Sequence, residues 1–517
     1  MSGLTRGIIG AGPARLSVAL ATFIAVLFVL RLSLFPGASD DDGEILYYTQ
    51  SWGLLYKGNQ PPLYAWLILA AEAVAGPVMA AVLAVKFLLL GTFYAFAYLA
   101  GRRLFADGLF AALAPLALVA CFFIGWDAVV NYSHTILLLA AMAAVLWLTL
   151  RLENRNGWTD YLWLALAIAA GMLAKYNFAL FLLPLLAGAW RHGGLRPRVF
   201  CPTFWIALAL AGLLAAAPLA AFLGDAGAVS GAVGAGRLFP PVDDRLAAAV
   251  RGLTQFTVSS LGMVSPLLPL AVFMFPRAMG PLPHPMPRLI QSGRFLEAYL
   301  VTLVLLAVAA ILVTGASDVR NNWLVVWFPA AFYLLLRIKV FTDAASGDRG
   351  RALAGRLHWF AVCLLVIALA VPVGLIVRGA VGPETCRKCN FFIPYGDLAR
   401  SLASAGFTTG TVVAEDRPNQ LAGNLRRYFP KARTISTRWR DYRPPLPKSP
   451  PQSAPGKCLV IWLGDGGGGA LALATKLRGA PIPDDVTRRR VTLPLPRNGD
   501  RRLTWSYLVM DGMGECR

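Results

Sequence analysis

Four acidic side chains near one end of an apolar segment are the first candidates for chemistry in this chain. Asp40, Asp41, Asp42 and Glu44 lie within five residues, just after a segment (residues 16–35) of membrane-spanning length. A carboxylate held at the membrane surface can act as a general base toward a hydroxyl group, and neighbouring carboxylates can bind a divalent metal such as Mg²⁺ or Mn²⁺. The alternative is a solvated loop whose acidic groups stabilise the N-terminus of a following helix.

Aromatic residues follow the acidic run and favour a functional interpretation. Tyr47, Tyr48, Trp52 and Tyr56 are side chains of the kind that lie at a membrane–water interface. An acidic group beside such a segment is placed to act on a substrate at the membrane surface. If a metal takes part, Asp41 and Asp42 are its expected ligands, and no other cofactor is indicated.

The composition indicates a polytopic membrane protein. The chain has 517 residues, of which 57% are hydrophobic and 15% charged, and its mean hydropathy is +0.60. This excludes an ordinary soluble enzyme. The formal charge of +21 comes from basic residues in short loops between apolar segments, as in cytoplasmic membrane loops, and no basic helix or aromatic–basic module suggests nucleic acid. The first apolar segment lacks a clear cleavage site and is expected to remain as a span.

About eleven apolar segments have spanning length. They are residues 16–35, 78–100, 108–125, 133–150, 160–175, 178–190, 203–223, 256–276, 295–314, 323–337 and 358–378. The segment 61–77 is short and contains Glu72 and several Pro and Gly residues, so its placement is decided by the positive-inside rule. If it is an interfacial helix, most loop arginines fall on the cytoplasmic side. The parts expected on the opposite side are the acidic run, residues 126–132, 224–255 and 315–322, and everything after about 379.

The segment after residue 378 is more polar and long enough for a small domain. Its pattern predicts helices at 395–405, 420–428 and 470–477 and strands at 411–414, 458–463 and 503–509, which indicates a small α/β domain. A Pro-rich stretch at 444–455 is expected to be a linker or loop. The Gly-rich run at 464–469 lacks the Lys-Ser/Thr of a nucleotide-binding phosphate loop and is expected to be a turn.

Seven cysteines fall into two groups. Cys121, Cys201 and Cys363 lie in or beside apolar segments and are expected to be packing residues. Cys386, Cys389, Cys458 and Cys516 lie in the C-terminal segment, where an oxidising compartment favours disulfides over a zinc site, since no second CxxC pair or nearby His is present. The spacing leaves the disulfide connectivity open.

Several motifs resemble those of a known enzyme group. An acidic pair, an aromatic segment and Gln60-Pro61-Pro62-Leu63-Tyr64-Ala65-Trp66-Leu67 follow one another as in the first exported loop of the GT-C membrane glycosyltransferases of families 39 and 83. The group includes protein O-mannosyltransferases and enzymes that add aminoarabinose or galacturonic acid to lipid A and lipopolysaccharide core. Residues 131–135, 174–178 and 317–323 resemble further motifs of the group. The acidic motif itself departs from the group at one position, since Gly43 stands where Ala is more usual.

The resemblance implies an all-α, polytopic GT-C membrane domain (residues 1–378, with the exported loop at 36–77) and a small periplasmic α/β domain (residues 379–517). It implies that Asp41 or Asp42 is the catalytic base, without deciding between them. The closest subgroup implied is that of lipid A and lipopolysaccharide-core galacturonosyltransferases.

Cations and polar groups are candidates for substrate binding. A lipid-linked sugar donor presents a phosphate at the membrane surface, which Lys57, Lys175 and Arg320 can contact, unless they only contact lipid headgroups or form ordinary salt bridges. Lys86 lies inside a predicted span, where an ionisable group is costly and often functional, or else extends to the interface. The remaining candidate substrate-binding residues are Glu44, Gln60, Tyr64, Asp127, Asn131, His134, Tyr176 and Asp318.

Together these features predict a multi-pass enzyme of the bacterial inner membrane with its C-terminal domain in the periplasm. It would transfer a sugar, with galacturonic acid as the leading expectation, from a polyprenyl-phosphate donor to lipid A, lipopolysaccharide core or a related glycolipid, with inversion. The donor, the glycolipid acceptor and membrane lipids are the expected partners, and nucleic acid is not. Two alternatives remain open: a protein O-mannosyltransferase-like enzyme, and a transporter or flippase of lipid-linked sugars.

Overall fold

The computed structural model describes most of the chain, in two compact units. The described residues are 13–56, 60–227, 229, 245–281, 287–319, 321–386, 389–416, 420–439, 442–446, 456–496 and 498–517. One unit, here called the helical unit, comprises Met1–Val26, Gly58–Leu63 and Lys86–Pro372. The other, here called the mixed unit, comprises Leu27–Lys57, Tyr64–Val85 and Val373–Arg517. The acidic run therefore groups with the C-terminal segment.

Seven helical segments among the described residues are long and apolar enough to cross a membrane, which confirms a multi-pass membrane protein. Six of them correspond to single helices: α2 (Pro13–Leu34), α5 (Met79–Phe105), α8 (His134–Arg151), α12 (Pro202–Gly224), α16 (Pro287–Thr314) and α18 (Gly347–Thr385). The seventh is Trp323–Asp343, which comprises the end of η4 (Asn321–Trp327) and α17 (Pro329–Asp343). Each of the seven overlaps one of the spans expected from the sequence.

The other four expected spans are helical but shorter or interrupted. They correspond to α6 (Gly108–Val119) with the π-helix η1 (Phe123–Asp127) and α7 (Ala128–Val130), to α9 (Trp158–Ala174), to η2 (Tyr176–Phe178) with α10 (Ala179–Arg191), and to α14 (Arg245–Met263) with α15 (Leu267–Met274). The prediction of one uninterrupted span at 256–276 is wrong, because Pro266 has no N–H to continue the ladder of α14. The prediction of a loop at 224–255 is also wrong for its last part, because residues from Arg245 onward belong to helix α14.

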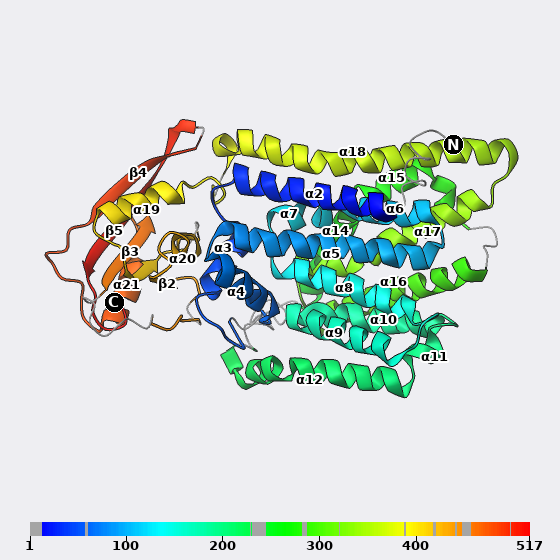
Figure 1. Cartoon of the computed structure of the whole chain (residues 1–517), viewed down its shortest axis with the longest axis horizontal. Coiled ribbons are helices and arrows are strands. Elements are labelled where there is room, and N and C mark those ends of the chain that lie inside the picture. Colours follow the sequence, from blue (N-terminus) through cyan, green and yellow to red (C-terminus); the bar gives the residue numbers. More distant parts are fainter. Residues whose placement is uncertain are drawn as a thin grey trace. The chain divides into compact units, whose positions relative to one another are not determined.

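Helix α4 (Leu63–Ala75) covers the doubtful segment at 61–77 and has 13 residues. Its length is about 20 Å, below the roughly 30 Å of a bilayer core. Within the helical unit, α10 packs on α16, α8 on α9, and α9 on α12, and Figure 1 shows these helices running side by side. The short segment α11 (Arg196–Val199) connects toward α12, and η3 (Pro276–Met279) follows α15.

The mixed unit contains a five-stranded sheet in the order β2-β1-β3-β5-β4. The strands are β1 (Gly410–Ala414), β2 (Arg433–Ser436), β3 (Lys457–Leu463), β4 (Arg489–Leu495) and β5 (Asn498–Asp511). Strand β1 pairs in parallel with β2 and β3, whereas β5 pairs antiparallel with β3 and β4. With α3 (Asp40–Tyr48), α19 (Tyr395–Ser404), α20 (Leu421–Arg426) and α21 (Gly468–Arg478), this confirms the predicted α/β character of the C-terminal segment.

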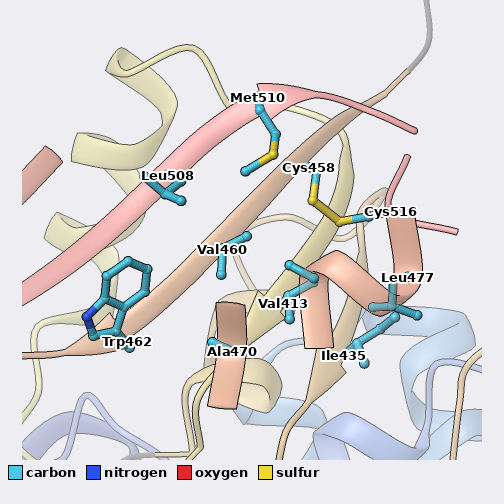
Figure 2. Close-up of a cluster of buried hydrophobic side chains, with 11 residues drawn as sticks. Val413, Ile435, Cys458, Val460, Trp462, Ala470, Leu477, Leu508, Met510 and Cys516 are labelled. Carbon is cyan, nitrogen blue, oxygen red and sulfur yellow. A yellow bond between two sulfur atoms is a disulfide. The ribbon is translucent and has the colours of Figure 1, made fainter. Parts of the chain in front are cut away.

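Alternate residues of the central strands build one face of the sheet into a core. Val413 of β1, Val460 and Trp462 of β3 and Leu508 of β5 are buried together with Leu477 of α21, as Figure 2 shows. Because side chains alternate across a strand, these residues all point to the face that α21 covers. The packing fixes the position of α21 against β3.

Two disulfides join the four C-terminal cysteines, Cys386 with Cys389 and Cys458 with Cys516. The prediction that these cysteines are paired is confirmed, and the connectivity that the spacing left open is now assigned. Cys121, Cys201 and Cys363 are free, also as predicted. Most of the expected Pro-rich linker, from residue 447 to 455, lies outside the described residues.

Candidate functional site

Helix α3 carries the acidic run in its first turn. Ser39 is the N-cap, and its hydroxyl accepts a hydrogen bond from the Asp42 backbone N–H at 3.0 Å. Asp40, Asp41 and Asp42 follow it in the first turn, where the helix dipole favours negative charge. The alternative interpretation of the run as an N-terminal cap is therefore correct for the local structure, and further function must come from the individual carboxylates.

The three aspartates have different environments. Asp42 is fully buried and its carboxylate lies 3.5 Å from the Arg31 guanidinium of α2. Asp40 accepts a hydrogen bond from the Asn390 side chain. Asp41 is half-buried. Of the two candidates for the base, Asp42 is thus held inside the protein by an ion pair, and Asp41 is the one with solvent-accessible surface.

Arg31 is itself held by several groups. Its guanidinium donates to the backbone carbonyls of Phe35 and Gly37 at 3.4 and 3.3 Å, and it lies 4.7 Å from the Phe391 ring centroid. A buried arginine needs such partners because its desolvation is costly. Arg31 therefore anchors Asp42 and the start of α3 to the end of α2.

Tyr64, from the first turn of α4, lies near the same carboxylates. It is fully buried, and burial, with the negative charges of Asp42 and Asp41, holds its pKa well above the usual range of a tyrosine. The phenol is therefore a neutral hydroxyl beside the acidic turn at every physiological pH. Glu44 is half-buried and lies near Tyr48, one turn further along α3; burial and the Glu44 charge raise the pKa of Tyr48.

The aromatic residues after the acidic run mostly pack inside the protein, which corrects their predicted placement at a membrane interface. Tyr47, Tyr48 and Tyr56 are buried and their rings lie 5.3–5.7 Å from the Tyr442 ring. The residues that cover them come from the C-terminal segment, which a local pattern does not reveal. Trp52 remains 65% exposed and stacks on Trp66 at 5.7 Å.

Helix α3 contacts α20 through two glycines. A Cβ atom at Gly423 would lie 2.0 Å from the Gly43 carbonyl oxygen, and one at Gly43 would lie 2.9 Å from the Gln420 Cβ. Asn424 of α20 accepts a hydrogen bond from the Ala38 N–H at 3.0 Å. The close backbone approach explains why a glycine stands at position 43, next to Asp42.

A buried ion pair fixes the other end of α3. Arg426 of α20 binds the Glu72 carboxylate of α4 with both terminal nitrogens, at 2.7 and 3.1 Å. The same guanidinium donates to the carbonyls of Leu46 and Thr49 at 2.6 and 2.7 Å. Carbonyls at a helix C-terminus have no partner within the helix, and a cation there is favourable. Arg426 therefore caps α3 while Glu72 balances its charge.

Candidate residues of the helical unit form a second group. Lys175 is buried and its amine donates to the Thr135 hydroxyl at 2.8 Å, so the motifs at 131–135 and 174–178 lie together. His134 is buried in the first turn of α8. Asn131 donates to the Asp127 carboxylate at 3.0 Å, and the Tyr176 ring lies 4.3 Å from that of Phe222.

The remaining candidates have mixed outcomes. Lys86 of α5 is fully buried, which is not the environment expected of a side chain that extends to the membrane surface. Asp318 and Gln60 are half-buried. The neighbouring segment η4 contacts α8, η1 and α14. Lys57 and Arg320 lie outside the described residues.

The candidates thus fall into two groups, one in each unit: Asp41, Asp42, Glu44 and Tyr64 in the mixed unit, and the other described ones in the helical unit. A metal at Asp41 and Asp42 stays a prediction. Asp42 already faces a guanidinium, and the described residues contain no group of three or more His, Cys, Asp or Glu side chains arranged to hold a metal.

Sequence reasoning missed Arg31, Glu72 as an ion-pair partner, and Arg426. Arg31 and Glu72 could have been found from the sequence, because an ionisable residue within an apolar segment is costly to bury and needs a partner. Arg426 had no such signal, since it is one of many arginines in the C-terminal segment and its partner Glu72 is 354 positions away in the chain.

Comparisons with known proteins agree on one class of enzyme. Residues 59–222 match the family model described as dolichyl-phosphate-mannose-protein mannosyltransferase. The lipopolysaccharide core galacturonosyltransferase RgtA of Rhizobium johnstonii is 28% identical over 460 residues, which cover 86% of each chain. RgtB of the same organism, with the same description, is 25% identical over 454 residues, which cover 87% of each chain.

Among solved structures, the chain shares the fold of ArnT from Cupriavidus metallidurans. The structure of ArnT bound to undecaprenyl phosphate aligns with a TM-score of 0.57 and 14% identity, covering 95% of this chain and 97% of that one. The apo structure aligns with a TM-score of 0.59 and 15% identity, covering 96% and 98%. The likeness extends over both the helices and the C-terminal sheet domain.

Proposed function

We propose that this chain, a membrane glycosyltransferase of the GT-C superfamily, transfers galacturonic acid from a polyprenyl-phosphate donor to lipopolysaccharide core, lipid A or a related glycolipid. The superfamily and the enzyme class, both predicted from the sequence motifs, are supported by the matches to the mannosyltransferase family model and to RgtA and RgtB, and the fold agrees with that of ArnT. The sugar, the acceptor and the carrier are the proposed part.

The similarity to RgtA is the observation that supports galacturonic acid as the sugar and a glycolipid as the acceptor. The match extends over 460 residues and covers 86% of both chains, so it is not limited to one part of the helical segment. The structure of ArnT with undecaprenyl phosphate supports a polyprenyl-phosphate carrier for an enzyme of this fold. A lipid-linked donor also suits a chain whose spans are not interrupted by a large domain for a soluble nucleotide sugar.

In the proposed reaction, Asp41 acts as the general base. The acceptor hydroxyl oxygen attacks C1 of the sugar from the face opposite the phosphate, and its proton passes to the Asp41 carboxylate. The new C1–O bond forms as the bond from C1 to the phosphate oxygen breaks, and the electron pair leaves with the polyprenyl phosphate. Asp42 lies 3.5 Å from the Arg31 guanidinium and positions the turn that presents Asp41.

Cations stabilise the departing phosphate in this proposal. Lys175 has the best-defined environment of the candidates, because the Thr135 hydroxyl accepts one of its hydrogen bonds and the side chain is buried. A lysine in a site with little water interacts strongly with a developing negative charge. Lys57, Lys86 and Arg320 are proposed to contribute to the same phosphate, and Gln60, Tyr64, Asp127, Asn131, His134, Tyr176, Asp318 and Glu44 to the sugar and acceptor.

The proposed location is the bacterial inner membrane, with the mixed unit's C-terminal domain in the periplasm. The disulfides Cys386–Cys389 and Cys458–Cys516 support an oxidising compartment for that domain. The positive-inside rule supports the same orientation, because it assigns most loop arginines to the cytoplasm.

A protein acceptor is the second candidate, and one observation favours it: the description of the family model that residues 59–222 match. We rank it below a glycolipid acceptor because RgtA and RgtB match over most of the chain. The transporter alternative is set aside, since the relatives and the family model are named as transferases.

Mass spectrometry of the envelope, with and without the gene, tests the proposed substrate. We expect the core or lipid A of the deletion strain to lack one or more galacturonic acid residues, and a plasmid copy of the gene to restore them. Intact-mass analysis of exported proteins serves as the parallel measurement. An unchanged glycolipid profile with a lost protein-linked sugar would contradict the glycolipid acceptor and support the second candidate.

A further inference from the structure

Two cavities of about 320 and 410 Å³ in the helical unit lie between η3, the end of α17 and the start of α18. Both are lined by Arg277, Phe341 and Arg349, and the smaller one is also lined by Phe275 and Arg356. The three elements come from different parts of the chain and meet where α17 ends at Asp343 and α18 begins at Gly347. None of these residues belongs to the candidate catalytic groups.

Among the described residues, the arginines around the cavities, Arg277, Arg349 and Arg356, have no carboxylate partner. The nearby Asp343 pairs with Lys339 at 3.0 Å, and Asp348 pairs with Arg351. Three guanidinium groups around one hollow repel one another, so an anion bound among them is stabilised.

Besides the arginines, the cavities are lined by apolar side chains. Phe275, Phe341 and Leu353 are buried and line the smaller cavity, and the Arg349 guanidinium lies 5.5 Å from the Phe341 ring centroid. One turn beyond Arg356, Trp359 is 62% exposed at the start of the apolar part of α18. An exposed tryptophan between a basic segment and a spanning segment is typical of the level of lipid headgroups.

We propose that this hollow binds the phosphodiester headgroup of an anionic membrane phospholipid. The arginines contact the phosphate, for which guanidinium is well suited, and the apolar wall of Phe275, Phe341 and Leu353 contacts the start of the acyl chains. Basic pockets between membrane helices on the cytoplasmic side bind anionic headgroups in this way. The assignment does not depend on the proposed transfer reaction, because it uses none of the residues assigned to it.

The test compares phospholipid bound to purified full-length variants in detergent by native mass spectrometry, with phosphatidylglycerol or phosphatidylcholine added. The double variant Arg277→Gln/Arg349→Gln removes two of the lining cations. Arg351→Gln is the matched control, since Arg351 lies on the same helix, is 82% exposed and pairs with Asp348 without lining either cavity.

We expect the wild type and Arg351→Gln to bind phosphatidylglycerol in preference to phosphatidylcholine. The double variant should bind it about 25-fold more weakly, or about fivefold for each arginine removed. If the double variant does not fold, the exposed single substitution Arg356→Gln gives the same comparison with an expected change of about fivefold. Equal binding by wild type and variant would overturn the proposal.

Two competition experiments separate the sources of phosphate. Inorganic phosphate that displaces phosphatidylglycerol completely at equal concentration would show a simple anion site and contradict a lipid ligand. Preference for undecaprenyl phosphate over phosphatidylglycerol at this hollow, lost in the double variant, would assign it to the carrier lipid and also overturn the proposal.

Discussion

Replacing Asp41 with asparagine is expected to lower sugar transfer by about 10²–10⁴-fold, the usual contribution of a general base, and to leave the protein folded. Asparagine has the same shape but cannot accept the proton of the acceptor hydroxyl. Asp41 is half-buried, so replacing its carboxylate with an amide of the same shape costs less than the same change at the fully buried Asp42. The measurement is the transfer rate of purified protein, normalised to the folded fraction.

Asp42→Asn distinguishes the two candidates for the base. The substitution removes the negative partner of the buried Arg31 guanidinium, 3.5 Å away, so its main expected effect is a lower thermal midpoint, by the equivalent of about 3–5 kcal/mol. Asp40→Asn is the matched control in the same helical turn. If folded Asp41→Asn protein transferred sugar at the wild-type rate, while Asp42→Asn protein did not, the base would be Asp42.

Replacing Glu72 with alanine is expected to give the largest loss of stability outside the catalytic turn, about 3–5 kcal/mol. The Arg426 guanidinium would remain among Leu46, Thr49 and the body of α4 without its counter-charge, since the side chains of Glu72 and Arg426 are only 5% and 10% exposed. Because Arg426 caps the end of α3, transfer should fall as well. Thermal unfolding in detergent measures the first effect.

The matched control is Asp397→Ala in α19. Asp397 pairs with Arg400, whose side chain is 82% exposed, three residues along the same helix, and such exposed pairs contribute less than about 1 kcal/mol. A thermal midpoint for Glu72→Ala no lower than that of Asp397→Ala would show that the Glu72–Arg426 pair does not hold α3 in place.

Much of the fold could be predicted because its signals are local. Apolar segments of spanning length and the short apolar runs at residues 458–463 and 411–414 depend only on neighbouring residues. Strand β2, Arg433–Ser436, was missed because four residues with a charged start carry too little pattern, although all four are buried in the folded chain beside β1. Strand β4 was missed because most of its side chains are exposed or only half-buried, and the alternation of Val491, Leu493 and Leu495 covers too few residues to stand out.

In the candidate site, too, the features that could be predicted are those formed by neighbouring residues. The acidic run and the Gln60–Leu67 motif are contiguous, so the sequence alone indicates them. Several partners that hold helix α3 in place are far away in the chain: Asn390 lies 350 positions from Asp40, and Arg426 lies 377 positions from Thr49. Only the folded chain distinguishes the buried, ion-paired carboxylate of Asp42 from the half-buried one of Asp41.

The most direct test of the central claim is a transfer assay with the purified chain in vesicles. The vesicles contain polyprenyl-phosphate-linked galacturonic acid and a lipopolysaccharide core acceptor that lacks this sugar, and mass spectrometry follows the acceptor. We predict that the acceptor gains galacturonic acid with wild-type protein and with Asp40→Asn, but not with Asp41→Asn. An acceptor that stays unmodified with active, folded wild-type protein, while another sugar or a protein acceptor is used instead, would contradict the claim.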